Sequence, residues 1–240
     1  MENQLNITAI GKNLDFRTGK LPDLPSAAGE VRKGVITAPG DYFRRKYKEM
    51  ESAMYPYDGM LVSYSVSEGF ILFQENVATN IGGQSVQGEL KLESNLKSLG
   101  INTKKAYSPN DLSETLKMLR VLFADKDQWL AIVKNLKNFT AEATTKIEKE
   151  NDDKGNKKDS IVQTLINSFD LSFNLSAPIF EGFHDKESFK VEILVNVRSS
   201  ALEMYLQSVE LKEIMDNAAF SIITKELDKY DNLIPVIQLS

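Results

Sequence analysis

The sequence predicts an α+β fold with two mostly antiparallel β-meander units, a central helical segment and a C-terminal amphipathic helix. Three observations predict it. Apolar and polar residues alternate along Phe189–Val197, as they do in a strand with one buried face. A similar alternation runs through Val86–Leu92. Between these segments, Leu112, Leu116 and Leu119 recur at the spacing of an amphipathic helix.

Residues 1–34 are expected to form an irregular N-terminal arm. The prolines and the small residues within Pro22–Gly29 interrupt any regular periodicity there. A short strand at Val35–Thr37 is expected next. It leads to a helix over Tyr42–Met54, for which Asp41 is the expected N-cap.

Two strands joined by a tight turn follow this helix. Met60–Val66 alternates loosely, and Phe70–Gln74 is compact and apolar. Ser67–Gly69 between them fits a hairpin turn. Together with Val86–Leu92, these strands make a meander of about three strands.

The middle of the chain is expected to be helical. Ser108 is a good N-cap residue, and Pro109 suits the first position of a helix. A second helix is expected from Gln128, with Asp125 or Asp127 as its N-cap.

The last third of the chain predicts a second meander. Leu171–Ser176, Phe189–Val197 and Leu202–Val209 are its expected strands. An amphipathic helix is expected over Leu211–Leu227. The apolar tail Ile234–Ile237 is expected to pack against the body of the protein, because it would be adhesive if exposed.

Residues 35–240 are expected to form a single α+β domain. In the alternative interpretation, two units are joined near 151–159, a run that is entirely polar and mostly charged. A chain of 240 residues is long enough to bury a core without disulfide or metal staples. Its 42% hydrophobic and 26% charged residues argue against wholesale disorder.

The composition also limits the chemistry. The absence of cysteine excludes disulfides, thiolate metal sites and cysteine nucleophiles, and fits a reducing cytoplasm. The N-terminal residues do not resemble a signal peptide, and no apolar run is long enough to span a bilayer. The net charge of −5 disfavours non-specific adhesion to nucleic acid. We therefore expect a cytoplasmic protein that does not associate with a membrane.

One stretch of the sequence is similar to a known family. Pro178–Gly182 is followed by an alternating strand that ends in Arg198, then by a further strand, a helix and a closing Pro235-Val236. This order resembles the YfdQ-like family of phage and prophage proteins, whose function is unknown. The resemblance covers roughly residues 35–236 and is specific between Phe169 and Arg198.

The resemblance implies a phage accessory protein in the cytoplasm of a bacterial host. It implies early expression, and binding in phage nucleic-acid metabolism or in counter-defence. It carries no catalytic residue over to this chain, so catalytic residues stay unknown.

A basic cluster is the candidate site for nucleic acid or phosphate. Arginine and lysine side chains next to aromatic rings can hold phosphates and stack on bases. The alternative is a solvated helix face, because the residues of one helix point in several directions. The cluster consists of Arg44, Arg45, Lys46 and Lys48.

The sequence favours a binding protein over an enzyme. His184 is the only histidine, and a turn between two strands is the simpler interpretation of its surroundings. A single histidine without cysteine does not make a common zinc site, so no metal is predicted. No phosphate-loop, dinucleotide-binding or serine-hydrolase motif is present, and no cofactor is predicted.

Several functions stay open from the sequence. The partner is expected to be a host protein or nucleic acid, and the chain is expected to form a homo-oligomer. One alternative is a single-strand nucleic-acid binding or annealing protein that uses the basic cluster. Another is an inhibitor or sponge of a host defence factor or nucleotide, with a pocket lined by aromatics such as Phe43, Tyr64 and Phe180. A virion structural protein and an enzyme with a carboxylate-held metal are further alternatives.

Overall fold

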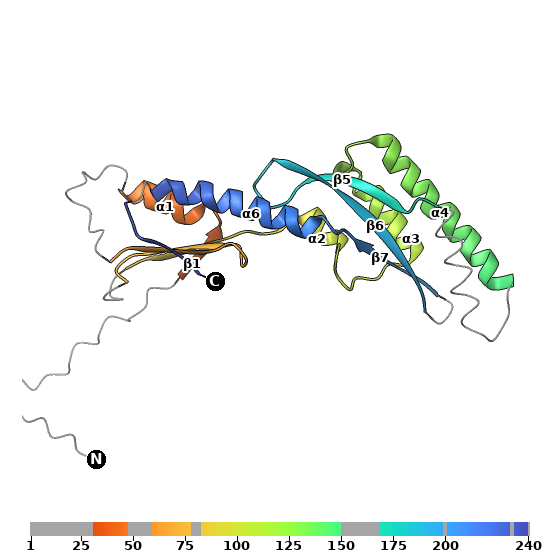
Figure 1. The fold of residues 1–240 in the computed structure, drawn as a ribbon, viewed down its shortest axis with the longest axis horizontal. Helices are drawn as coiled ribbons and strands as arrows, with labels where there is room; N and C mark the ends of the chain where they lie inside the picture. The colour runs from red at the N-terminus through yellow and green to blue at the C-terminus, as the bar shows by residue number, and fades with distance from the viewer. Residues whose placement is uncertain are drawn as a thin grey trace, which may run out of the picture.

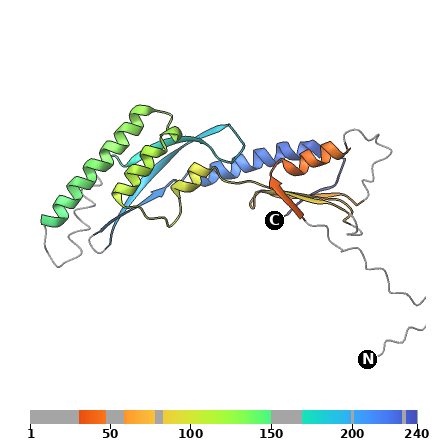
Figure 2. The ribbon, with the colours of Figure 1, turned by 180° about the vertical axis from the view of Figure 1, so that it is seen from behind.

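A computed structural model describes six stretches of the chain: residues 31–47, 59–77, 83–149, 169–198, 201–230 and 233–239. The molecule is elongated, with two lobes joined by one long helix (Figures 1 and 2). Most of the expected arm, the end of the helix predicted to reach Met54, and the polar run at 151–159 lie outside the described residues.

The first lobe contains a five-stranded sheet in the order β1-β4-β3-β2-β8. Its middle is the predicted meander, because β3 pairs antiparallel with both β2 and β4. Its two edges are parallel pairs, β1 with β4 and β8 with β2, which the sequence did not indicate. The strands are β1 (Val31–Val35), β2 (Leu61–Ser65), β3 (Phe70–Gln74), β4 (Ser85–Glu89) and β8 (Val236–Gln238).

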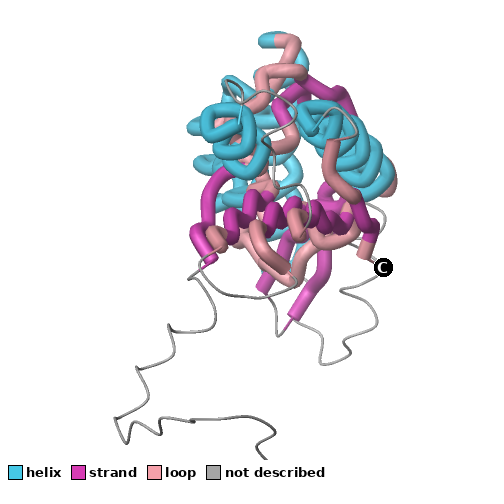
Figure 3. Tube along the Cα trace, turned by 90° about the vertical axis from the view of Figure 1, so that its left-hand side faces the viewer, coloured by secondary structure: helices cyan, strands magenta, loops and turns pink. Residues whose placement is uncertain are grey.

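Helices cover one face of this sheet (Figure 3). Helix α1 (Ala38–Tyr47) lies over β3 and β4. The end of helix α6 (Leu211–Leu227) and the short 3-10 helix η3 (Asp228–Tyr230) lie beside α1. We call this unit the five-stranded lobe.

The start of the five-stranded lobe differs from the prediction. Strand β1 begins at Val31, so residues 31–34 belong to the sheet and not to an irregular arm. Asp41 lies within α1 and is not its N-cap, since the helix already begins at Ala38. The Asp41 side chain instead binds Lys229, which lies far away in the sequence.

The second lobe is built on the antiparallel sheet β5-β6-β7, as the sequence predicted. Its strands are β5 (Ser172–Pro178), β6 (Lys186–Arg198) and β7 (Ala201–Gln207). Helices α3 (Pro109–Met118) and α4 (Lys126–Lys149) contact each other and this sheet. We call this unit the three-stranded lobe.

The predicted start of α3 is confirmed, and the helix predicted from Gln128 begins two residues earlier, at Lys126. The Ser108 hydroxyl accepts a hydrogen bond from the backbone N–H of Asp111, and Pro109 is the first residue of α3. For α4, the Asp125 carboxylate accepts from the backbone N–H of Asp127. Asp125 is therefore the capping residue of the two alternatives.

The short helix α2 (Ser94–Leu99) was not predicted. The Glu93 carboxylate caps it by accepting from the backbone N–H groups of Asn95 and Leu96. Gly100 ends it with a φ of 61°, the left-handed conformation that glycine adopts without strain.

Two clusters of buried side chains form the core, one in each lobe. Helix α6 joins them: Leu211 and Ala219 belong to the cluster of the three-stranded lobe, and Ile223 to that of the five-stranded lobe. Four half-buried side chains pack against both clusters: Val66, Leu90, Phe183 and Ile222. The two mostly antiparallel sheets and the helices packed on them confirm the predicted α+β fold class.

Candidate functional site

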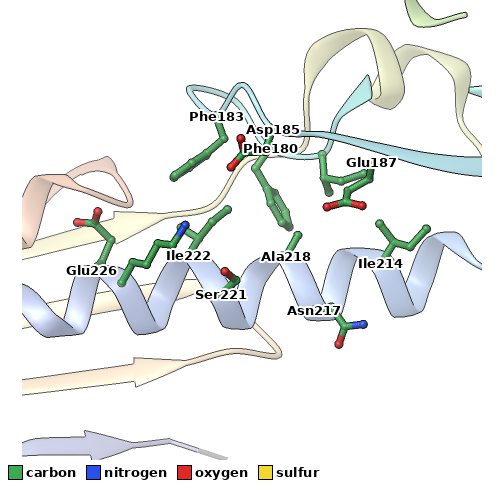
Figure 4. A pocket seen from close by; sticks show the side chains of 12 residues that line it. Phe180, Phe183, Asp185, Glu187, Ile214, Asn217, Ala218, Ser221, Ile222 and Glu226 are labelled. Atoms are coloured by element: carbon green, nitrogen blue, oxygen red, sulfur yellow. The ribbon is translucent and has the colours of Figure 1, made fainter. Parts of the chain in front are cut away.

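A cavity of about 270 Å³ lies where the two lobes meet. One wall is the connection between β5 and β6, and the other is α6 (Figure 4). We call this cavity the interlobe pocket. It is lined by Ile179, Phe180, Phe183, Asp185, Glu187, Ile214, Asn217, Ala218, Ser221, Ile222, Lys225 and Glu226.

The inner wall of the interlobe pocket is apolar. Phe180 and Phe183 reach from the β5–β6 connection toward α6 (Figure 4). Ile214, Ala218 and Ile222 face them from α6, each one half-buried. Their positions follow a spacing of four residues, which places them on one side of the helix.

Backbone contacts hold the β5–β6 connection in place. Phe180 forms an isolated bridge with Leu92, and the backbone N–H of Glu181 donates to the carbonyl of Lys91 at 2.8 Å. Gly182 then turns the chain with a φ of 84°, and nothing lies within 4 Å of the position a Cβ would take. The aromatic wall is therefore anchored to Lys91 and Leu92, which lie between β4 and α2.

Charged side chains surround the apolar wall. Asp185 at the end of the β5–β6 connection and Glu187 at the start of β6 are exposed to solvent. Lys225, also exposed, lies on α6 toward its C-terminal end. Glu226 is the buried exception, with 8% of its surface exposed.

Glu226 belongs to an ion-pair cluster that joins α6 to α1. The Lys229 ammonium lies 2.7 Å from the Glu226 carboxylate and 3.0 Å from the Asp41 carboxylate. Burial alone would lower the pKa of Lys229, but hydrogen bonds to both carboxylates raise it above its usual value. Burial alone would raise the pKa of Asp41, but the hydrogen bond from Lys229 lowers it below its usual value. Both partners thus stay charged at neutral pH.

The structure describes three of the four residues of the predicted basic cluster, all of them on α1. Arg44 and Arg45 are exposed on α1. The Lys46 ammonium is bound to the Glu75 carboxylate at 2.7 Å and is not a free cation. Lys48 lies outside the described residues. Among the described residues of the cluster, the two adjacent and exposed arginines are therefore the candidates for contact with phosphate.

Glu75 accepts four hydrogen bonds, one of them from the Lys46 ammonium. The Tyr47 hydroxyl donates at 2.7 Å, the Tyr42 hydroxyl at 3.1 Å and the backbone N–H of Gln84 at 3.1 Å. Burial would raise the pKa of Glu75, but the hydrogen bonds from Lys46 and Tyr47 hold it below its usual value. The cluster joins α1 to the end of β3, and we assign it a structural role.

Of the three aromatics expected to line a pocket, Phe180 lines the interlobe pocket, and Phe43 and Tyr64 do not. Phe43 is 4% exposed and lies in the core of the five-stranded lobe. Tyr64 donates its hydroxyl hydrogen to Gln238 of β8. Phe183 also lines the pocket and was not predicted, because the residues around His184 have no periodic pattern of apolar side chains.

Comparison of the chain with models of protein families, with curated proteins and with solved structures finds no match. Among the helices described, none is both long and apolar enough to cross a membrane. In the described stretches, no three His, Asp or Glu side chains come together as a metal site would require. The interlobe pocket is therefore the feature of this structure that points to a function.

Proposed function

We propose that the chain is a non-enzymatic binding protein whose ligand is a small molecule with an apolar body, held in the interlobe pocket. The observation that carries this proposal is the apolar wall, formed by Phe180 and Phe183 opposite Ala218. Ligand pockets are concave, mostly apolar and equipped with a few polar groups at fixed positions. The phage accessory role that the resemblance implies is part of the same proposal.

The size of the cavity favours a small ligand. Its volume of about 270 Å³ is just below the range of about 300–1,000 Å³ that is usual for drug-sized ligands. One aromatic ring or branched alkyl chain with a short polar end has suitable dimensions. A nucleotide is a poor fit, because its phosphates would meet the Asp185 and Glu187 carboxylates.

Binding of 2-phenylethanol, a neutral probe with an aromatic body, tests the proposal. By ligand efficiency we expect a Kd on the order of a millimolar, measured by calorimetry. Ala218→Trp should fill the cavity and abolish binding. Ala218→Leu, a milder obstruction, should weaken it. Thermal unfolding of each variant shows whether the fold is intact.

Phe220→Ala is the matched control for the α6 variants. Phe220 is 61% exposed and does not line the interlobe pocket, so its truncation should leave the affinity unchanged. No binding by the wild type, or equal binding by a folded Ala218→Trp variant, contradicts the proposal.

The prophage context has its own test. Early expression predicts that the amount of this protein rises soon after induction in a lysogen that carries its gene. A constant amount through induction contradicts that part of the proposal.

A second candidate function is weak binding of single-stranded nucleic acid through Arg44 and Arg45, which are adjacent and exposed. Two phosphate contacts predict a shallow dependence on salt, with a slope of about −1.4 in a plot of log affinity against log salt. Fluorescence anisotropy with a labelled oligonucleotide measures this slope. A steep slope, or binding that survives Arg44→Ala/Arg45→Ala, excludes this pair as the site.

A further inference from the structure

We infer that the interlobe pocket selects a small organic cation, namely an apolar body that carries a primary ammonium group. This inference rests on the proposed binding function and adds the charge of the ligand to it. The evidence is the distribution of charged side chains around the apolar wall.

Two carboxylates, one at the end of the β5–β6 connection and one at the start of β6, are available to a ligand. Asp185 and Glu187 both line the cavity. Within the part of the chain that the structure describes, neither forms an ion pair or a side-chain hydrogen bond. In Figure 4 the Glu187 carboxylate lies between the connection and α6, above Ala218 and Ile214. A cation at this place would lie beside the aromatic ring of Phe180.

Aromatic rings strengthen the preference for a cation. The face of a phenyl ring is electronegative, and an ammonium group within about 6 Å of the ring centre gains roughly 0.5–1 kcal/mol at an exposed site. Phe180 and Phe183 lie next to the two carboxylates in the sequence and along the same wall. Charge and ring faces therefore favour the same ligand.

The cations near the pocket do not cancel this preference. Lys229 is bound to Glu226 and Asp41, so its ammonium group is already paired within the protein. Lys225 also lines the pocket, but its backbone lies eleven positions beyond that of Ile214 on α6, or about 16 Å along the helix axis at 1.5 Å per residue. The end of the pocket formed by Glu187 and Ile214 is thus the acidic end.

Three probes with a phenyl body test the inference by calorimetry at low salt. These are 2-phenylethylamine, which is cationic at neutral pH, neutral 2-phenylethanol and anionic 3-phenylpropanoate. We expect the amine to bind about three- to fivefold more tightly than the alcohol, as for an exposed ion pair, and the anion to bind most weakly. The advantage of the amine should shrink as salt rises.

The variant Asp185→Asn/Glu187→Gln should lose the preference for the amine and keep its affinity for the alcohol. The control Glu213→Gln removes an exposed carboxylate of α6 that does not line the pocket, and should retain the preference. Equal affinities for the three probes, tighter binding of the anion, or a preference that persists in the double variant would overturn the inference. If no probe binds, the proposed function itself fails.

Discussion

The Glu75 carboxylate shows how single residues decide the use of a sequence motif. Lys46 appears in a run of cations, but its ammonium group is bound to the Glu75 carboxylate and the hydroxyl of Tyr42. Nothing in the local sequence reveals this, because Glu75 follows a strand that is distant along the chain. The charge pattern could be read from the sequence, and the pairing could not.

Stability should depend on pH through Glu75. Its pKa is lower in the folded protein than in the unfolded chain, where a glutamate has a pKa of about 4.3. The stabilisation is therefore complete above that unfolded value and is lost as pH falls through the lower folded pKa. We expect Glu75→Gln to cost about 1–3 kcal/mol at pH 7 and less at pH 3, measured by urea unfolding. An equal cost at both pH values contradicts this.

Two tyrosines should respond oppositely to removal of the hydroxyl group. The Tyr230 hydroxyl is buried and has no hydrogen-bond partner among the residues described. Tyr230→Phe should therefore leave the free energy of unfolding unchanged or raise it by up to about 1 kcal/mol. Tyr47→Phe removes a 2.7 Å bond to buried Glu75 and should lower it by about 1–2 kcal/mol. The reverse order in thermal unfolding would show that the two environments are wrongly assigned.

At the scale of elements, strands and capped helices could be predicted where the signal was local. The hairpin β2–β3 and the start of α3 depend on neighbouring residues, and both were found. The helix α2 was missed because its N-cap is Glu93, a residue that rarely serves as a cap. The parallel pairs at the edges of the large sheet join distant segments and leave no local pattern.

Gly88 is the position that permits one of these pairs. A Cβ there would lie 2.7 Å from the carbonyl oxygen of Val35 and 2.8 Å from the Cα of Ile36, both backbone atoms that cannot easily move. We expect Gly88→Ala to destabilise the protein by about 2 kcal/mol in urea unfolding. Ser85→Ala, on the same strand, should cost under about 0.5 kcal/mol. Equal effects would mean that β1 does not approach β4 so closely.

At the scale of the whole molecule, α6 connects the cores of two lobes, each built on one of the two predicted meanders. The alternative of two units joined near 151–159 follows the polar composition of that run, which lies outside the described residues. The two cores that the structure describes meet along α6 and the segment around Leu90. The pocket forms at this junction from residues of β5–β6 and α6, so neither segment alone indicated it.

The shared contacts predict that the lobes unfold together. Trp129 is the only tryptophan and packs in the three-stranded lobe, where its indole N–H donates to the carbonyl of Leu116. Its fluorescence and the far-ultraviolet circular dichroism should therefore give the same urea midpoint. Ile222→Ala, which removes a contact shared by both cores, should lower both midpoints equally. Separate midpoints in the wild type would contradict a joint core.

A nuclear magnetic resonance titration with isoleucine methyl labels can show whether a ligand binds between the lobes. The side chains of Ile179, Ile214 and Ile222 line the interlobe pocket. We expect their methyl signals to shift in a dose-dependent manner when 2-phenylethylamine is added. Ile132 on α4 and Ile237 on β8 serve as internal controls, and their methyl signals should not shift. Shifts confined to the control methyls, or no shifts at millimolar probe, would contradict a binding site between the lobes.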